Sequence, residues 1–420
     1  MCTSGSDETA GTTSDRLYGW VARRIGVGAI SRRDDVGEGA AVLALFGRFV
    51  DELASGLPLV LMPTLQRRLG LSVAQVGWCL QALSGAAAVV EPVSAVAIDV
   101  VRRRPLLVWG ALGWAVSLLL VAGAPSYGWL LAAFAVAGIG SGPLAQTTDV
   151  LLVEMYPGAE ERIGARQTLL DTTGALLAPA AVAAVGWAGG DLRLPLVVSG
   201  LAILGYAALL AVTPMPDPPA QHGRRDHPLR DTRAGLADVL ADREARIWLV
   251  ALLCETLVEI PAVFEPVWLG RDVGAPQSLV AVHAAVELSA ALGGLMLLDR
   301  WLQRHDARTI LTVASVANLV LYPVWLLVPG VWAKIVLSVP LALAIAPVWP
   351  LVRARALAAV PGRGGMVMAI MSLYGVLPLT ALFGWVSGRV GLTPSMFAVH
   401  MTATLAMLIT VRRRVGEASD

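Results

Sequence analysis

The stretch FGRFVDELASGLPLVLMP, residues 46–63, places three charged side chains in an apolar run that is long enough to enter a membrane. Each ionised group at the centre of a bilayer costs about 2.5–3.5 kcal/mol. Arg48 precedes Asp51 by three residues and Glu52 by four, so on a helix it shares a face with both acids. The stretch therefore predicts a membrane helix in which Arg48 pairs with one of these carboxylates.

The composition of the whole chain is that of a polytopic membrane protein. Of its 420 residues, 56% are hydrophobic and 15% are charged, and the mean hydropathy is +0.68. A membrane-spanning helix needs about 20 mostly apolar residues. Twelve segments meet this requirement: 40–63, 74–99, 105–123, 128–153, 166–187, 193–213, 246–269, 277–299, 308–327, 331–355, 365–388 and 391–411. The sequence therefore predicts an all-α protein with twelve transmembrane helices in a lipid bilayer.

Basic residues are distributed unequally between the two sides that these helices define. With both termini in the cytoplasm, 25 Arg and Lys residues fall on the inner side and 6 on the outer side. This asymmetry predicts a multi-pass protein of the cell (cytoplasmic) membrane with both termini cytoplasmic. The first 40 residues contain no apolar segment typical of a cleavable signal peptide. Residues 16–33 predict either an interfacial helix or an unstructured tail.

A long polar connection divides the chain into two six-helix bundles. The predicted parts are a cytoplasmic tail (1–39), a first bundle (40–213), a cytoplasmic central loop (214–245), a second bundle (246–411) and a cytoplasmic tail (412–420). The first helix of each bundle contains the pattern E-x5-P-x4-P-x4-R, which starts at Glu52 and again at Glu255. Two further matches lie at equivalent helix ends, Asp99 with Asp299 and Pro157-Gly158 with Pro361-Gly362. Parallel repeats of this kind place a substrate site near the midplane of the bilayer.

Short motifs in both halves resemble those of one transporter family. The loop after the second helix reads AVAIDVVRRR, and its copy in the second half reads DRWLQR. The fifth helix contains GALLAPAAVA. The residues that match the family patterns are Asp99, Arg103, Arg104, Asp299, Arg300, Gly174 and Pro179. With the twelve helices and the 6+6 duplication, they resemble the major facilitator superfamily of secondary transporters, and within it the drug-efflux-like members.

The resemblance implies transport by alternating access and a gate on the cytoplasmic side. Asp149 and Arg353 occupy equivalent inner ends of the fourth and tenth helices, so we expect them to pair when that side closes. The alternative is that Asp149 pairs within its own half, with Arg102, Arg103, Arg162 or Arg166. Many drug antiporters of the family have an arginine in the fourth helix that assists proton coupling, and Phe134 stands at that position here. Proton exchange would therefore need other groups.

Seven ionisable residues are expected at bilayer depth and form the predicted cavity for substrate and protons: Arg48, Asp51, Glu52, Glu255, Glu259, His283 and Glu287. One arginine cannot neutralise five carboxylates, and the remaining charges would cost on the order of 10 kcal/mol. A water-filled cavity, bound protons or a cationic substrate would each remove this cost. We expect Glu52 and Glu255 to line the cavity and at least one of them to exchange a proton. The alternative is that some of the acids face neighbouring helices and stay protonated.

His283 and Glu287 are one helical turn apart, which is a spacing that can bring two metal ligands together. Two ligands are too few for a metal site. The pair therefore predicts either a hydrogen-bonded proton pair or ordinary packing, and no metal is expected.

The sequence lacks the motifs of enzymes and of ATP-driven transport. It contains no G-x-x-x-x-G-K-[ST], H-E-x-x-H or G-x-S-x-G pattern, and its five histidines are scattered. We therefore expect no catalytic residue and no cofactor, a monomer, and no nucleic-acid partner. The predicted function is secondary transport of a small organic solute, as proton-coupled export of a cationic or amphipathic compound. The alternatives are a proton-coupled importer, a non-transporting sensor and a membrane-embedded enzyme.

Overall fold

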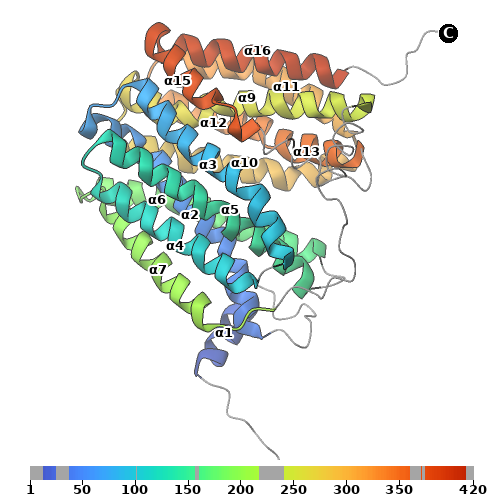
Figure 1. The fold of residues 1–420 in the computed structure, drawn as a ribbon. Coiled ribbons are helices and arrows are strands. Elements are labelled where there is room, and N and C mark those ends of the chain that lie inside the picture. Colours follow the sequence, from blue (N-terminus) through green and yellow to red (C-terminus); the bar gives the residue numbers. More distant parts are fainter. Residues whose placement is uncertain are drawn as a thin grey trace, which may run out of the picture.

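The protein is built from helices in both halves of the chain (Figure 1). The structure, a computed structural model, describes residues 13–24, 37–100, 102–156, 160–216, 241–359, 370 and 374–412. The first half contains α1 (Thr13–Arg24), α2 (Glu38–Leu69), α3 (Val73–Val100), α4 (Arg103–Gly123), α5 (Tyr127–Met155), α6 (Glu160–Trp187) and α7 (Leu194–Val212). The second contains α9 (Arg243–Arg271), α10 (Gln277–Leu302), α11 (Ala307–Leu327), α12 (Val331–Ile345), α13 (Val348–Ala359), α15 (Leu379–Val390) and α16 (Leu392–Arg412).

The helices confirm the predicted all-α architecture of twelve transmembrane helices in a 6+6 arrangement. Among the described residues, ten helices are long and apolar enough to cross a membrane, with α12 and α13 counted as one span, Val331–Ala356. Two predicted segments differ in detail. The segment 331–355 is interrupted at Ala346 and Pro347, and in 365–388 the described helix α15 begins only after Pro378. Proline has no backbone N–H to continue a helical ladder, so both breaks are local consequences of the sequence.

Several predicted features lie outside the described residues. These are the side chains of Asp99 and Asp299, the Pro-Gly pairs 157–158 and 361–362, and most of the central loop, residues 217–240. In the N-terminal tail, the structure shows α1 as a helix that contacts α2. Part of the 16–33 segment is therefore helical, as one of the two expectations for it stated.

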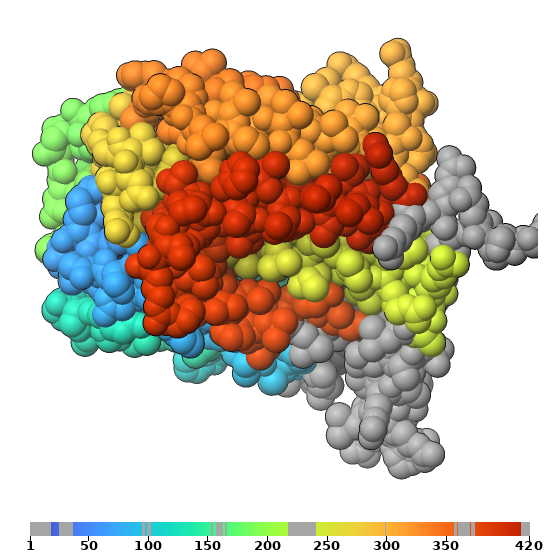
Figure 2. Space-filling model, turned by 90° about the horizontal axis from the view of Figure 1, so that it is seen from above, coloured from blue at the N-terminus to red at the C-terminus, as the bar shows by residue number. Residues whose placement is uncertain are grey.

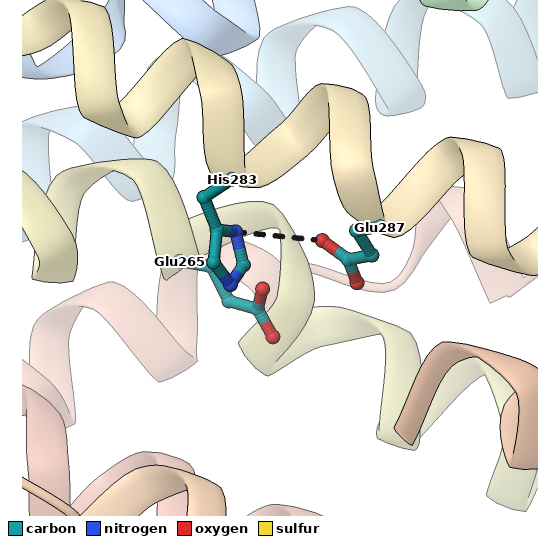
Figure 3. A group of neighbouring side chains, drawn as sticks. All are labelled: Glu265, His283 and Glu287. Carbon is teal, nitrogen blue, oxygen red and sulfur yellow. Dashed lines mark ion pairs between the residues drawn. The ribbon is translucent and has the colours of Figure 1, made fainter. Parts of the chain in front are cut away.

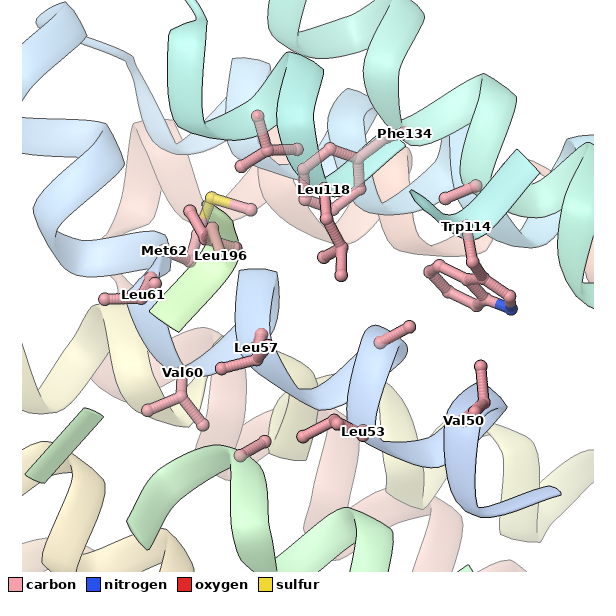
Figure 4. Packing of buried hydrophobic residues seen from close by; sticks show 14 of the residues in the cluster. Val50, Leu53, Leu57, Val60, Leu61, Met62, Trp114, Leu118, Phe134 and Leu196 are labelled. Carbon is pink, nitrogen blue, oxygen red and sulfur yellow. The ribbon is translucent and has the colours of Figure 1, made fainter. Parts of the chain in front are cut away.

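The long helices α2 and α9, one from each half, contact each other. Each contains two internal prolines, Pro58 and Pro63 in α2 and Pro261 and Pro266 in α9, as the sequence repeat predicts. One face of α2 packs against the rest of its half. Figure 4 shows Leu53 and Leu57 of α2 in the same buried cluster as Leu118 of α4. Burial of these side chains holds α2 within the first bundle.

The two halves are joined at the end of the molecule where α2 passes into α3, which we call the α2–α3 end. The side-chain amide of Gln277 on α10 donates to the carbonyl oxygen of Val60 on α2 at 2.6 Å and accepts from Thr64 Oγ1 at 2.8 Å. Gln81 on α3 donates to the carbonyl oxygen of Gly375 at 3.0 Å and accepts from the N–H of Thr380 at 3.2 Å. In Figure 2, surfaces from both halves abut at this end, on the left of the view.

Close glycine contacts also close the α2–α3 end. A Cβ at Gly77 of α3 would lie 2.9 Å from the carbonyl oxygen of Thr380 and 3.1 Å from the Cα of Gly384. Only a residue without a Cβ allows α3 and α15 to approach this closely. The contact between the halves at this end therefore depends on Gly77 and Gly384.

Gly138 offers a test of close packing within the first half. A Cβ here would overlap the carbonyl oxygen of Leu83, so Gly138→Ala must push α3 and α5 apart and is expected to lower the free energy of unfolding by about 1–3 kcal/mol. A Cβ at Gly205 of α7 meets no atom within 4 Å. Gly205→Ala is therefore expected to be neutral or to stabilise by up to about 1 kcal/mol. Thermal unfolding of both variants in one detergent measures the difference, and equal melting temperatures would contradict the close approach.

Candidate functional site

A cavity of about 430 Å³ lies between the two halves and contains the candidate site. It is lined by residues of α2, α6, α9, α10 and α12. Its titratable lining residues are Glu52, Glu259, Glu265, His283 and Glu287. A second cavity, of about 280 Å³, shares Ser55 and Glu259 with the first and extends between α3 and the 374–380 segment. Four carboxylates and one imidazole therefore border the first space, with no arginine or lysine among its described lining residues.

Arg48 of α2 is the centre of a cluster of acids beside this cavity. Its guanidinium lies 3.5 Å from the carboxylates of Asp51 and Glu52, which confirms the pairing that their spacing predicts. It also lies 3.8 Å from Asp149 of α5 and 3.5 Å from Asp171 of α6. One arginine thus contacts acids from three helices, whereas the spacing of residues within α2 predicts only the contacts with Asp51 and Glu52.

Asp51 is the most fully satisfied of these acids. Its side chain is buried. One carboxylate oxygen accepts hydrogen bonds from Trp114 Nε1 at 2.6 Å and from Ser141 Oγ at 2.9 Å, while the other faces Arg48. Donors of this kind compensate a buried negative charge. Asp51 is not among the lining residues of the cavity, so the structure places it as an anchor for Arg48.

Asp149 pairs with residues of its own half of the chain, which agrees with one of the two expectations for it. Its partners are nevertheless different from those expected: Asp149 accepts a hydrogen bond from Gln167 and lies beside Arg48. Of the four arginines proposed for it, Arg103 instead forms two hydrogen bonds with Glu154. The reason is that α5 packs beside α2, which brings Asp149 level with Arg48. The guanidinium of Arg353 lies 5.9 Å from the ring centroid of Trp349, and its pairing with Asp149 stays a prediction.

The repeat-related glutamates do not have equivalent surroundings. Glu52 lines the cavity, whereas Glu255 is not among its lining residues, so the expectation that both line it stays a prediction for Glu255. Oε2 of Glu255 is buried with no hydrogen-bond partner within the described part of the chain. Glu259, one turn further along α9, lines both cavities instead. The repeat in the sequence therefore predicts the position along the helix, but not which carboxylate on α9 reaches the cavity.

Glu265, His283 and Glu287 form a second polar cluster on the cavity wall (Figure 3). Nδ1 of His283 lies 3.8 Å from the carboxylate of Glu287. Glu265 approaches from α9, and one potential ligand atom from each residue lies within 4.8 Å of the others. Two ligands were predicted to be too few for a metal, but the fold supplies a third.

Two acids of the site, Asp171 and Glu265, were not predicted. Each stands alone in an apolar context, in TLLDTTGAL and in VFEPVWL, and this is the signal that could have identified them. Their partners lie on other helices: Asp171 contacts Arg48 on α2, and Glu265 lies beside His283 on α10. Only the packing of the helices shows these neighbours.

The described motif residues differ in their structural positions. Arg103 is buried and pairs with Glu154, which joins α4 to α5. Arg104 and Arg300 are exposed. A Cβ at Gly174 of α6 would overlap the carbonyl oxygen of Phe49, so this glycine allows α6 to approach α2. Pro179, one turn or so further along α6, lines the cavity.

A comparison of the sequence with protein-family models shows the family to which the chain belongs. The family model described as Major Facilitator Superfamily matches residues 44–375. The chain belongs to the Major Facilitator Superfamily. As a member, it is a multi-pass secondary transporter of a small-molecule substrate and not an enzyme. A comparison with curated proteins gives no match.

Solved structures of this superfamily have the same fold at low sequence identity. The nucleoside transporter NupG is 11% identical with a TM-score of 0.71, over 89% of this chain and 100% of that one. A bacterial homologue of the human lysosomal transporter Spinster, inward-facing and unoccupied, is 17% identical with a TM-score of 0.64, over 89% and 93%. The xylose transporter XylE from E. coli, partially occluded and inward open, is 12% identical with a TM-score of 0.65, over 88% and 96%. At these identities the likeness shows the fold alone.

The cluster around Arg48 predicts strong coupling between Arg48 and Asp171. Arg48→Gln leaves four neighbouring carboxylates without their cation, so it should destabilise the protein. In that background, Asp171→Asn removes a repulsive charge and should recover part of the loss. A double-mutant cycle by thermal unfolding should give a coupling of about 0.5–3 kcal/mol.

Glu287→Gln in the same Arg48→Gln background is the control, since Glu287 belongs to the other cluster. It should give no recovery. Additive effects of Arg48→Gln and Asp171→Asn would contradict the shared ion pair.

Proposed function

We propose that the protein transports small organic cations, or amphipathic compounds with a basic centre, in exchange for protons. The observation that supports this most is the cavity itself, whose described lining has four carboxylates and no arginine or lysine. A positive charge inside a low-dielectric space is stabilised strongly by nearby carboxylates. The apolar lining, which includes Leu59, Val263 and Leu288, suits the hydrocarbon part of such a compound.

Proton exchange follows from the same charges. Glu52 and Glu259 face one cavity, and Glu255 lies one turn from Glu259. When no cation is bound, keeping all three ionised within the membrane is costly, so protons compensate them. A cation that enters favours the ionised carboxylates and releases the protons. This exchange does not need the arginine that the fourth helix lacks at Phe134.

The structure corresponds to one state of an alternating cycle. If the basic loops are cytoplasmic, as the charge asymmetry predicts, the joined α2–α3 end faces outward and the cavity opens inward. Two of the similar structures are described as inward-facing or inward open, which supports this assignment. Both termini then lie in the cytoplasm, and the protein itself spans the cell membrane. Export of the cation against entering protons is the direction proposed here, on the likeness of the motifs to drug-efflux members.

Transport in proteoliposomes tests the proposed exchange. With a panel of lipophilic cations such as tetraphenylphosphonium and an imposed pH gradient, the wild-type protein should drive cation movement. Glu52→Gln and Glu259→Gln should each reduce gradient-driven transport by about tenfold or more, the effect of about 1.4 kcal/mol. Glu255→Gln should weaken the dependence on the gradient.

Glu244→Gln is a suitable control, because Glu244 lies at the start of α9 beside Arg308 and outside the cavity. It should keep wild-type transport. Normal gradient-driven transport by all three variants, at Glu52, Glu255 and Glu259, would reject proton exchange at these residues.

Closure of the α2–α3 end can be tested separately. Gly77→Val should prevent the approach of α3 to α15 and shift the population away from the joined state. In a variant without Cys2, Cys79 and Cys254, paired cysteines at Ala74 and Gly388 report the contact, because a Cβ at Gly388 would lie 4.0 Å from the backbone nitrogen of Ala74.

The disulfide-linked peptide, quantified by mass spectrometry after oxidation, should decrease strongly with Gly77→Val and remain with Gly205→Val. Unchanged cross-linking would show that this contact does not control the state.

A further inference from the structure

We infer that Glu265, His283 and Glu287 form a binding site for one divalent transition-metal ion, of the Zn²⁺ or Co²⁺ class, on the wall of the central cavity. Two carboxylates and one imidazole are a common donor set for such ions. The three residues come from two helices that lie together in the second half, with Glu265 on α9 and the other two one turn apart on α10.

The positions of the donors fit a single ion. One donor atom from each residue lies within 4.8 Å of the others. Two ligands of one tetrahedral zinc ion, each about 2.0–2.2 Å from it, lie about 3.3–3.6 Å apart. Donor atoms at the upper limit of 4.8 Å must therefore approach each other by about 1.2–1.5 Å on binding, which rotation of the side chains can supply. In Figure 3 both carboxylates lie on one side of the imidazole of His283.

His283 provides a second and independent indication of a ligand. Its side chain is 2% exposed, and its Nε2 is buried with no hydrogen-bond partner within the described residues. A buried polar atom without a partner is costly, usually about 1–3 kcal/mol. His283 Nδ1 is 3.8 Å from Glu287, which is too long for a hydrogen bond. A metal ion between His283 and the carboxylates would satisfy the polar atoms that the protein alone leaves without partners.

The charges around the cluster also favour a cation. Glu265 is buried, and Glu287 is partly open to the cavity. The basic residue on the neighbouring α12, Lys334, has other partners than these carboxylates. Its ammonium donates to the carbonyl oxygens of Trp325 and Leu326 at 3.0 and 2.9 Å and lies over the ring of Trp268. A divalent ion with two carboxylates and a neutral imidazole gives a site with no net charge.

The donor set also indicates which metal ions the site favours. Ca²⁺ and Mg²⁺ prefer oxygen ligands alone, and Cu⁺ prefers sulfur. Imidazole with carboxylates suits Zn²⁺, Co²⁺ and related ions. Three protein ligands leave at least one coordination position toward the cavity, so the ion can enter from the cavity and exchange.

Metal binding by the purified full-length protein tests this inference. The protein is purified with an affinity tag that contains no histidine, and EDTA removes bound metal. It is then titrated with Co²⁺ and Zn²⁺ in detergent. The wild type should bind one ion per chain, with visible Co²⁺ absorption bands that Zn²⁺ abolishes. His283→Gln and Glu287→Gln should each weaken binding by about 100-fold or more and remove or shift these bands, since even outer-shell changes at metal sites cost 10–100-fold.

Glu244→Gln and His305→Gln are matched controls, because neither residue belongs to the cluster or lines the cavity. Both should keep wild-type affinity. Glu287→Gln is the variant least disruptive to folding, since Glu287 is partly open, and its melting temperature verifies that the protein remains folded. Absence of stoichiometric binding by the wild type, or unchanged binding by both cluster variants, would overturn the inference.

This inference does not rest on the proposed transport of organic cations. Metal binding is measured at equilibrium without a gradient. Retained metal binding with no cation transport would reject the proposed function alone, and the reverse result would reject the metal site alone.

Discussion

A carboxylate inside a membrane must be compensated by a cation, by hydrogen-bond donors, by water or by a proton. In the first half of this protein that requirement is met at Arg48, which contacts acids from α2, α5 and α6. Because Asp51 is in turn held by Trp114 of α4 and Ser141 of α5, the polar centre also ties helices together. The apolar faces of α2 can then pack around this centre, in which four acids share one cation.

The second half solves the same problem differently. Among the described residues, its acids at bilayer depth on α9 and α10 have one ion-pair partner, His283, and no arginine lies among them as Arg48 lies among those of the first half. The duplication therefore produced two similar scaffolds with different electrostatics. The first half places one arginine among its acids, whereas the second half leaves the charge of its acids to whatever enters the cavity. Protons, an organic cation and a metal ion would each compensate this negative charge, at different carboxylates.

Local features of the sequence were sufficient for much of the fold. The apolar segments predict the helices, and the three- and four-residue spacing predicts that Arg48 meets Asp51 and Glu52. The repeat of prolines predicts the equivalence of α2 and α9. The breaks before α13 and α15 were missed, although Pro347 and Pro378 mark them, since hydropathy averaged over a window does not detect a local loss of hydrogen bonds.

The site was less predictable, because its contacts depend on how helices are rotated and packed. Asp171 meets Arg48, and Glu265 meets His283, across separate helices. The choice between Glu255 and Glu259 as the cavity residue is a difference of one turn on α9. No spacing within a single helix determines such contacts.

The way the halves meet is consistent with a protein that must separate them again. At the α2–α3 end, Gln277 and Gln81 join the halves through neutral hydrogen bonds, and Gly77 and Gly384 through close backbone contact. A neutral hydrogen bond contributes only about 0.5–1.5 kcal/mol, so such a contact can open at modest cost. A bound cation can shift this equilibrium only if it interacts differently with the two states. Glu52 on one half and Glu259 on the other border the same cavity, so their distances to a shared cation change whenever the halves move, and this supplies the required difference.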